Sequence, residues 1–341
     1  MSRWLVTGGA GFIGSHFVRT ALGEGWVDKL AVVDALTYAG NLENLEPVRK
    51  HAGFAFHKVD ITDGQALAPV FGDGVDAVFH FAAESHVDRS IDSAAAFVQT
   101  NVGGTQVLLD VARARGVGRF VHVSTDEVYG SLALGSTERF TETSPIEPTS
   151  PYAASKAASD HLALAAQRTH GLDVVITRCT NNYGPYQFPE KFLPLFITNA
   201  FEHKALPLYG DGLNVRDWIH VEDHVRAIRL AFDKGKSGEV YNFGGECERA
   251  NKDLARAICQ ATHVPTDLIQ PVVDRKAHDR RYAIDATKSK RELGFRAGPP
   301  IEERLDALVG WYRDHRGWWE RIKQGAYRDY YERMYSVRGT T

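Results

Sequence analysis

The sequence is poor in cysteine and lacks any long hydrophobic run. Its 341 residues contain three cysteines, Cys179, Cys247 and Cys259, an odd number without CxxC spacing. This pattern disfavours a disulfide-stapled miniprotein and a metal site, and it favours free thiols in a reducing compartment. No apolar run approaches the roughly 20 residues that span a bilayer, and the chain enters a glycine-rich turn too early for a signal peptide. We therefore expect a cytoplasmic protein with no membrane partner.

A strong charge of either sign is also missing. The formal net charge is −3, so no global positive field would attract nucleic acid. Hydrophobic residues make up 43% and charged residues 24% of the chain, which is typical of a globular protein and excludes a disordered or collagen-like one. The length allows about two domains.

The first half of the chain alternates short β-branched runs with helical patterns. We expect strands over residues 4–7, 30–34, 54–60, 76–81, 119–124 and 172–178, and helices over residues 14–22, 93–115 and 152–170. Strands separated by crossover helices predict an α/β fold with a doubly wound parallel Rossmann sheet. We expect this sheet domain, with the catalytic residues, to occupy residues 1–184.

After about Gly184 the rhythm of the sequence changes. We expect residues 185–341 to form mainly a smaller C-terminal α/β lobe that binds the substrate, although the chain can cross between the two parts. Helices are expected over residues 221–233 and 252–261 and a strand over 240–243. The aromatic residues of the tail are expected mainly to pack this lobe: Trp318, Trp319, Tyr327, Tyr330, Tyr331 and Tyr335.

A glycine pattern near the amino terminus predicts a dinucleotide site. Gly8, Gly11 and Gly14 follow the first expected strand and open a helix, with Asp34 ending the second strand 20 residues further on. Such glycines permit a tight turn and a close approach of pyrophosphate to the helix amino terminus. The Asp34 carboxylate can accept hydrogen bonds from a ribose and would repel a 2′-phosphate, so NAD is favoured over NADP. Asp60 and Ile61 could hold the adenine.

Tyr152 and Lys156 lie four residues apart at the start of an expected helix, so both project from one face. A phenol has a pKa of about 10, and an adjacent ammonium group would stabilise its phenolate. This pair is suited to removing a hydroxyl proton while hydride leaves the same carbon.

Asp126 and Glu127 follow the expected strand 119–124, at an edge of the sheet where ligands bind. Two adjacent buried acids resist joint ionisation, so the pair can supply one protonated acid and one ionised base. An isolated Asp-Glu pair is more often a cap or a turn, but beside Tyr152 and Lys156 we interpret it as catalytic.

These motifs identify the chain as similar to the extended short-chain dehydrogenase/reductases and, within them, to the dTDP-glucose 4,6-dehydratase family. The matching segments are TGGAGFIGSH, VVDALTYAGNLENL, FAAESHVDRS, STDEVYG, SPYAASKAASDHL, NNYGPYQFPEKFLP, VRDWIHVEDH and HDRRYAID, and they run from residue 7 to 285. The STDEVYG segment separates the chain from related 4-epimerases, which usually lack the Asp-Glu pair.

The resemblance implies an enzyme that converts dTDP-glucose to dTDP-4-keto-6-deoxyglucose with tightly bound NAD, by C4 oxidation, loss of water across C5 and C6, and hydride return to C6. It implies that Tyr152 takes the C4 hydroxyl proton and that Thr125 aligns the C4 oxygen. Glu127 would remove the C5 proton, and protonated Asp126 would donate to the leaving C6 hydroxyl.

The resemblance also implies binding residues, position by position. Besides the three glycines, Tyr152 and Lys156, the cofactor would contact Phe12, Ile13, Asp34, Ala35, Leu36, Thr37, Asp60, Ile61, Phe81, Ala82, Ala83, Glu84, Thr100 and Asn182. The nucleotide sugar would contact Ser85, Thr125, Asn181, Lys191, Phe192, Pro207, Tyr209, Arg216, Asn251, Arg275 and His278. Judged alone, an arginine directly before an aspartate, as in Arg216-Asp217, would more often form a surface ion pair.

One segment departs from the family pattern. Where the family usually has Arg-Pro-Gly-His, this chain has Arg275-Lys276-Ala277-His278. We expect ordinary backbone angles at Ala277, a looser turn under Arg275 and weaker substrate binding with intact chemistry.

Three alternatives remain at this stage. The runner-up is a 4,6-dehydratase for UDP-glucose; a nucleotide-sugar 4-epimerase and a catalytically silent NAD-sensing module are less favoured. Both long expected helices carry apolar residues on more than one face, so we also expect a homodimer through a four-helix bundle, as in relatives.

Overall fold

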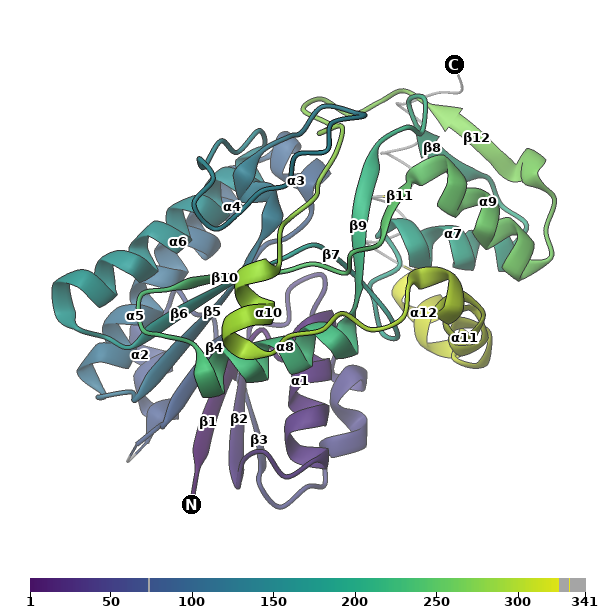
Figure 1. The fold of residues 1–341 in the computed structure, drawn as a ribbon. Helices are drawn as coiled ribbons and strands as arrows, with labels where there is room; N and C mark the ends of the chain where they lie inside the picture. Colours follow the sequence, from purple (N-terminus) through teal and green to yellow (C-terminus); the bar gives the residue numbers. More distant parts are fainter. Residues whose placement is uncertain (73, 325–330, 332–341) are drawn as a thin grey trace.

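The computed structural model describes residues 1–72, 74–324 and 331. A seven-stranded, wholly parallel sheet forms the centre of the first lobe, in the order β10-β6-β5-β4-β1-β2-β3 (Figure 1). Its strands are β1 (Arg3–Thr7), β2 (Lys29–Asp34), β3 (Phe54–Lys58), β4 (Ala77–His80), β5 (Arg119–Thr125), β6 (Val174–Cys179) and β10 (Val240–Phe243). The predicted Rossmann fold is confirmed.

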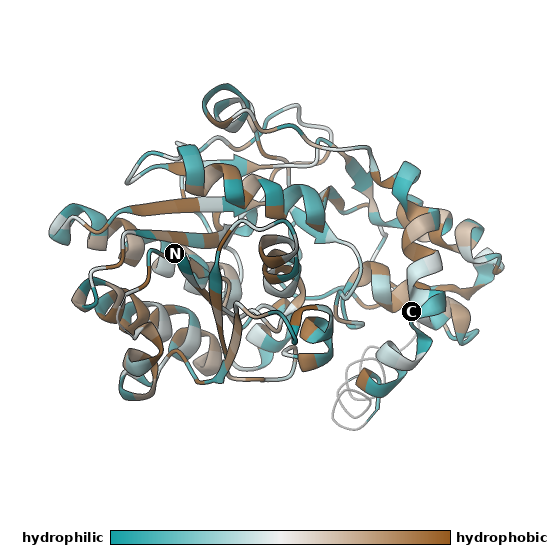
Figure 2. Ribbon diagram, turned by 90° about the horizontal axis from the view of Figure 1, so that it is seen from below, coloured by the Kyte–Doolittle hydropathy of each residue, from teal (hydrophilic) through white to brown (hydrophobic). Residues whose placement is uncertain are grey.

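Helices cover both faces of this sheet. They are α1 (Phe12–Gly23), α2 (Gly64–Leu67), α3 (Val87–Asp92), α4 (Ala95–Phe97), α5 (Thr105–Ala114), α6 (Pro151–His170), α8 (Val221–Lys234) and α10 (Thr287–Leu293). The helices α1 and α8 pack on one face, and α5 and α6 pack on the other. The strands between them are largely hydrophobic (Figure 2), because a parallel sheet buried on both faces needs apolar side chains on both.

The second lobe packs at the carboxyl ends of the strands. It contains β7 (Asn181–Tyr183), β8 (Leu206–Tyr209), β9 (Val215–His220), β11 (Glu248–Ala250), β12 (Ile269–Val272), α7 (Phe192–Phe201), α9 (Asn251–Thr262), α11 (Ile301–Asp314) and α12 (Arg316–Ile322). Short 3-10 helices span Leu42–Val48, Ala68–Phe71, Asp126–Tyr129 and Thr266–Leu268. The five strands of the second lobe form two small sheets, in the orders β11-β9-β7 and β12-β8.

The division at residue 184 is too simple. β10 pairs with β6, and α8 packs on the first lobe, so both belong to the Rossmann domain although they lie beyond residue 184. The strand predicted over 240–243 therefore extends the main sheet, which is one of the chain crossings that the sequence analysis allowed.

The prediction of a single helix over residues 93–115 is also wrong in part. Ser93 has an extended backbone, α4 begins after it, and a π-helical stretch, Val98–Gly104, separates α4 from α5. Asn101 in this stretch bonds both the main-chain N–H and C=O of Glu84 and donates to the Ser155 hydroxyl. These tertiary hydrogen bonds stabilise the local widening of the helix.

The sequence explains why α6 begins where it does. The Ser150 hydroxyl accepts a hydrogen bond from the Ala153 N–H at 3.1 Å, and Pro151 occupies the first helical position. Gly171, in the left-handed conformation, ends the helix. Among the described residues, no helix is long and apolar enough to cross a membrane, and no group of three or more His, Cys, Asp or Glu side chains is placed to hold a metal.

Candidate active site

Two adjoining cavities open where the strands of the main sheet end. The larger, of about 310 Å³, runs from the glycine loop to β5 and β6, and the smaller, of about 180 Å³, lies in the second lobe. Glu127, Asn181, Glu190 and Lys191 line both, so Glu127 lies at their junction.

The larger cavity collects the residues predicted for the cofactor. Leu36 is the exception: it does not line the cavity. The predicted residues that line it are Gly8, Gly11, Phe12, Ile13, Gly14, Asp34, Ala35, Thr37, Asp60, Ile61, Phe81, Ala82, Ala83, Glu84, Thr100, Tyr152, Lys156 and Asn182. Two predicted substrate residues, Ser85 and Thr125, also line this cavity.

The glycine loop is shaped as a dinucleotide requires. Gly8 has a φ of +69°, and a Cβ on it would lie 2.5 Å from the Ala82 nitrogen. A Cβ on Gly14 would lie 2.3 Å from the Gly8 oxygen, so α1 packs against the turn more closely than any other residue would permit. This contact brings the amino terminus of α1 to the cavity, where its free N–H groups can bind phosphate.

Asp34 is held in a fixed orientation at the end of β2. One carboxylate oxygen accepts from the Ala10 N–H at 2.9 Å and the other from the Leu36 N–H at 2.8 Å. Leu36 therefore contributes by orienting the Asp34 carboxylate through its main-chain N–H, although it does not line the cavity itself. Burial raises the pKa of Asp34, although these two N–H groups lower it. Because a carboxylate has about four acceptor positions, Asp34 can still accept from ribose hydroxyls, and this donor and acceptor set fits NAD.

Thr125, Asp126 and Glu127 lie at the end of β5, in a buried turn. The Thr125 hydroxyl donates to Asp126 at 3.3 Å, and its oxygen accepts from the Glu127 N–H at 3.3 Å. Burial raises the pKa of Asp126 well above its ordinary value, and the charges of Glu127 and Asp217 add to this effect. Burial also raises the pKa of Glu127, but the positive charges of Arg275, Lys191 and Arg216 oppose it.

Burial shifts both acids toward the protonated form, but to different degrees. The pKa of Asp126 is raised well above its ordinary value, whereas nearby cations oppose the rise in the pKa of Glu127, which makes Glu127 the better candidate for the base of the pair. One oxygen of Asp126, Oδ2, is buried and has no hydrogen-bond partner among the described residues, so it is available to a bound molecule.

The environment of Tyr152 differs from the prediction. Burial, together with Glu127, Cys179 and Asp126, raises the pKa of Tyr152 well above its ordinary value, and a hydrogen bond with Thr125 opposes this. The Lys156 ammonium instead donates to the Val123 main-chain oxygen at 2.9 Å, and burial lowers its pKa. We expected the Lys156 ammonium to stabilise the phenolate; in this arrangement burial has the largest effect, and the net change raises the pKa of Tyr152.

The smaller cavity collects most of the residues predicted for the nucleotide sugar. They are Asn181, Lys191, Phe192, Pro207, Tyr209, Arg216, Asn251, Arg275 and His278. Arg216 is buried, its guanidinium lies 4.2 Å from the centre of the Tyr282 ring, and it donates to the Val215 and Asp279 main-chain oxygens. The alternative of a surface ion pair with Asp217 is wrong, because Asp217 is also buried and accepts from the Gly245 and Cys247 N–H groups.

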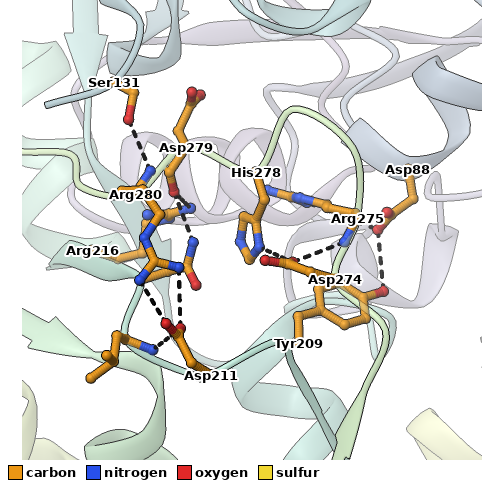
Figure 3. Close-up of polar contacts among 12 residues, drawn as sticks. Asp88, Ser131, Tyr209, Asp211, Arg216, Asp274, Arg275, His278, Asp279 and Arg280 are labelled. Atoms are coloured by element: carbon orange, nitrogen blue, oxygen red, sulfur yellow. Dashed lines mark hydrogen bonds and ion pairs between the residues drawn. The ribbon is translucent and has the colours of Figure 1, made fainter. Parts of the chain in front are cut away.

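The loop that carries Arg275 is strained where the chain departs from the family pattern. Ala277 has a φ of +50°, so the expectation of ordinary backbone angles there is wrong. The alanine adopts the left-handed conformation that a glycine would adopt without steric cost. Around it, His278 and Asp274 pair at 2.5 Å, and Arg275 lies 3.9 Å from Asp88 (Figure 3).

The sequence analysis missed several residues of the two cavities. Trp318 lines the larger cavity and donates to Asn44 at 3.0 Å, so this tail aromatic does more than pack, whereas Trp319 is buried in the core. Tyr282, Trp218 and Tyr331 line the smaller cavity. The predictions for Tyr327, Tyr330 and Tyr335 lie outside the described residues. The only sequence signal for Tyr282 was its position directly after the HDRR segment.

Fold and site together define a class: an NAD-dependent enzyme of the extended short-chain dehydrogenase/reductase type, with a second cavity lined by two arginines. Residues 5–307 match the family described as GDP-mannose 4,6 dehydratase. The dTDP-glucose 4,6-dehydratase of Streptomyces griseus is 54% identical over 318 residues, which are 93% of this chain and 95% of that protein.

Solved structures agree with these matches. DesIV, a dTDP-glucose 4,6-dehydratase of Streptomyces venezuelae solved with NAD bound, has a TM-score of 0.92 and 53% identity, covering 94% of this chain and all (100%) of that one. A UDP-glucose 4-epimerase of Thermotoga maritima has a TM-score of 0.83 and 32% identity, covering 92% and 99%. The chain belongs to the dTDP-glucose 4,6-dehydratases within this family. The predicted enzyme class and the predicted NAD cofactor are thereby confirmed.

Proposed function

We propose that the chain carries out the reaction of its family, the 4,6-dehydration of dTDP-glucose to dTDP-4-keto-6-deoxyglucose, and that the site residues take the roles below. The observation that carries these roles is the position of Glu127. It lies where the larger cavity, built for a dinucleotide, meets the smaller one, which is lined by two arginines.

The larger cavity holds NAD. The glycine loop and the α1 amino terminus bind the pyrophosphate, and Asp34 binds the adenosine ribose. NAD in this position supplies the hydride acceptor for oxidation at C4 and the hydride donor for reduction at C6.

The smaller cavity holds the nucleotide diphosphate. Arg216 and Arg275 both line it, and their forked N–H donors match phosphate oxygens. Tyr209 and Phe192 offer ring surfaces to the pyrimidine. The sugar then extends from these arginines toward Glu127, at the entrance to the larger cavity.

Tyr152 takes the proton of the C4 hydroxyl. Its hydrogen bond with Thr125 aligns the phenol with the C4 oxygen. The buried phenol resists ionisation, so proton transfer depends on positive charge nearby, and Lys156 supplies it from one turn further along α6.

Glu127 and Asp126 divide the elimination between them. Once C4 is a ketone, the C5 proton is acidic, and the ionised Glu127 removes it. Protonated Asp126 donates its proton to the C6 hydroxyl, which leaves as water. The raised pKa of Asp126 favours the protonated form that this step needs. When hydride returns to C6, a proton is delivered to C5, which completes the 4-keto-6-deoxy sugar.

One experiment tests the proposal and its alternatives. The full chain with bound NAD is incubated with dTDP-glucose or with UDP-glucose, and the 4-keto-6-deoxy product is measured by its absorbance in alkali and by mass. Product from dTDP-glucose supports the proposal, whereas product from UDP-glucose alone overturns the substrate assignment. Conversion of either sugar only to its C4 epimer would indicate an epimerase, and no conversion with NAD still bound would indicate a binding module.

The proposal includes a homodimer in the cytoplasm. Ala95 and Ala96 of α4 and the preceding Ala94 are exposed, and Val98 leaves 55% of its surface exposed. Leu162 of α6 is partly exposed, and α6 packs on the same face of the sheet as α5. Pairing these helices with their copies would bury this surface in a four-helix bundle. The three cysteines are free and buried, which suits the reducing cytoplasm.

A further inference from the structure

Asp279 links the two halves of the site, although no prediction assigned it a role. It is buried, with 7% of its surface exposed, and one carboxylate oxygen, Oδ2, accepts two hydrogen bonds. The Tyr282 hydroxyl donates at 2.5 Å and the Thr149 hydroxyl donates at 2.7 Å. A buried carboxylate that accepts from two segments fixes both relative to itself.

The main chain of Asp279 holds the substrate side. Its carbonyl oxygen accepts from Arg216 at 2.8 Å and from Asn214 at 3.0 Å. In Figure 3 this oxygen faces Arg216, while the carboxylate of Asp279 points away from it. Because the Tyr282 ring lies against the same guanidinium, Asp279 and its partner tyrosine fix Arg216 from two directions.

The carboxylate of Asp279 holds the catalytic side. Thr149 precedes Ser150, which caps α6, and two residues separate Thr149 from Tyr152. The position of Thr149 therefore sets where α6 begins and where the phenol of Tyr152 lies. No other described residue accepts the Thr149 hydroxyl in a side-chain hydrogen bond.

The rest of the segment is anchored independently. The Arg280 N–H donates to Ser131, and its side chain pairs with Asp211 at 2.8 Å (Figure 3). Tyr282 N–H donates to the Val215 oxygen. Asp279 is thus held by its neighbours even if its carboxylate is removed, so a variant there should fold.

We infer that Asp279 is a positioning residue, which keeps Arg216 and the start of α6 in one register so that the sugar reaches Tyr152. The inference rests on the proposed function. It predicts separable effects, because the bond to Thr149 serves only Tyr152, whereas the Asp279 carboxylate also holds Tyr282, whose ring lies against Arg216.

The test compares four full-length variants with bound NAD. Thr149→Val removes the hydrogen bond between Asp279 and the segment before α6. Asp279→Ala removes the carboxylate's bonds to both Thr149 and Tyr282, and Asp279→Asn keeps an oxygen that can accept from both of these hydroxyls. Thr143→Val is the control, since Thr143 lies in the same loop and, among the described residues, its side chain hydrogen-bonds only that of Thr141. The kcat and KM for dTDP-glucose, the Kd for dTDP and the Tm are measured for each.

We expect Thr149→Val to lower kcat roughly fivefold with KM and the Kd for dTDP unchanged. Asp279→Ala should lower kcat and raise both KM and Kd, each roughly fivefold or more. Asp279→Asn should restore values close to the wild type, and Thr143→Val should match it.

Other outcomes overturn the inference. A Thr149→Val variant with the kcat of the control, or variants that lose Tm but keep kcat and Kd, would show that Asp279 only braces the fold. If the wild-type chain does not convert dTDP-glucose at all, the proposed function fails and this inference falls with it. If the wild type converts it and the variants do not differ, only the inference fails.

Discussion

The Lys156 ammonium donates a hydrogen bond to the main-chain oxygen of Val123, at 2.9 Å. This bond ties α6, which carries Tyr152, to the end of β5, which carries Thr125, Asp126 and Glu127. The proposed catalytic groups therefore come from two elements, and this bond is one of the buried contacts that hold those elements together; His122 of β5, which contacts Ser159 of α6 at 3.1 Å, is another.

Replacing Glu127 by glutamine should separate oxidation from elimination. The amide cannot accept the C5 proton, so we expect dehydration to slow by about 10²-fold or more. Reduction of bound cofactor on adding dTDP-glucose should continue and can be followed by its absorbance. Normal product formation by Glu127→Gln would show that another group is the base.

The protonation of Asp126 predicts a pH dependence of stability. Its pKa is raised in the folded state, so the folded chain binds this proton more tightly than the unfolded chain. The resulting stabilisation is complete below the ordinary pKa and is lost as pH rises through the folded-state value. Asp126→Asn removes the titration, and the Tm of the variant minus that of the wild type should increase with rising pH. A difference that is constant with pH would contradict the assignment.

Activity should depend on the same proton. Because Asp126 must be protonated to help the C6 hydroxyl leave, kcat should fall at high pH in the wild type. In Asp126→Asn we expect kcat to be at least about 10²-fold lower at the pH where the wild type is most active, and the difference should narrow as the wild type loses its proton. A kcat profile measured across the stable range checks both statements.

Ala277 predicts an improvement by substitution. Its left-handed backbone costs a residue other than glycine about 1 kcal/mol. Ala277→Gly should relieve this strain, hold Arg275 and His278 in place, and lower KM for dTDP-glucose a few-fold with kcat unchanged. His263→Gly is the control, because His263 also has a positive φ, of +58°, but ends α9 and lines neither cavity. An unchanged KM in Ala277→Gly would show that strain there does not affect binding.

The glycine loop offers a matched pair within one helix. A Cβ on Gly14 would meet the Gly8 oxygen at 2.3 Å, whereas a Cβ on Gly23 would meet nothing within 4 Å. Gly14→Ala should therefore lose most of its bound NAD and a few kcal/mol of stability, but Gly23→Ala should lose neither. The NAD content of the purified protein and its Tm measure both effects, and equal NAD content in the two variants would contradict the proposed cofactor loop.

The exposed apolar surface near α4 predicts the oligomeric state. Light scattering at micromolar concentration should give twice the mass of one chain for the wild type and a lower mass for Val98→Asp. Leu134→Asp, at a residue 39% exposed outside these helices, should remain a dimer. A wild-type mass of one chain would refute the dimer.

Much of the site could be predicted because it follows strands. Gly8, Asp34 and Asp126 each come just after or at the end of a strand, and parallel strands bring their carboxyl ends to one edge. The residues that were missed, such as Asn44, Trp318 and Tyr282, come from loops and helices whose place depends on packing between distant segments. Trp318 reaches Asn44 across 274 positions of the chain, and no local pattern indicates such a contact.

The sequence by itself determined the Rossmann sheet and the NAD cofactor, and it supplied the proposed catalytic groups, because strand periodicity, glycine spacing and the Asp-Glu and Tyr-Lys pairs are local patterns. Tertiary structure alone decided how these groups ionise. Tyr152 and Lys156 are near in sequence, yet burial and the neighbouring Glu127 raise the phenol pKa, and Val123 takes the ammonium. It also decided that β10 joins the main sheet and that Ala277 keeps a left-handed backbone. Desolvation and backbone strain depend on what surrounds a residue in space, and the order of the chain does not contain that information.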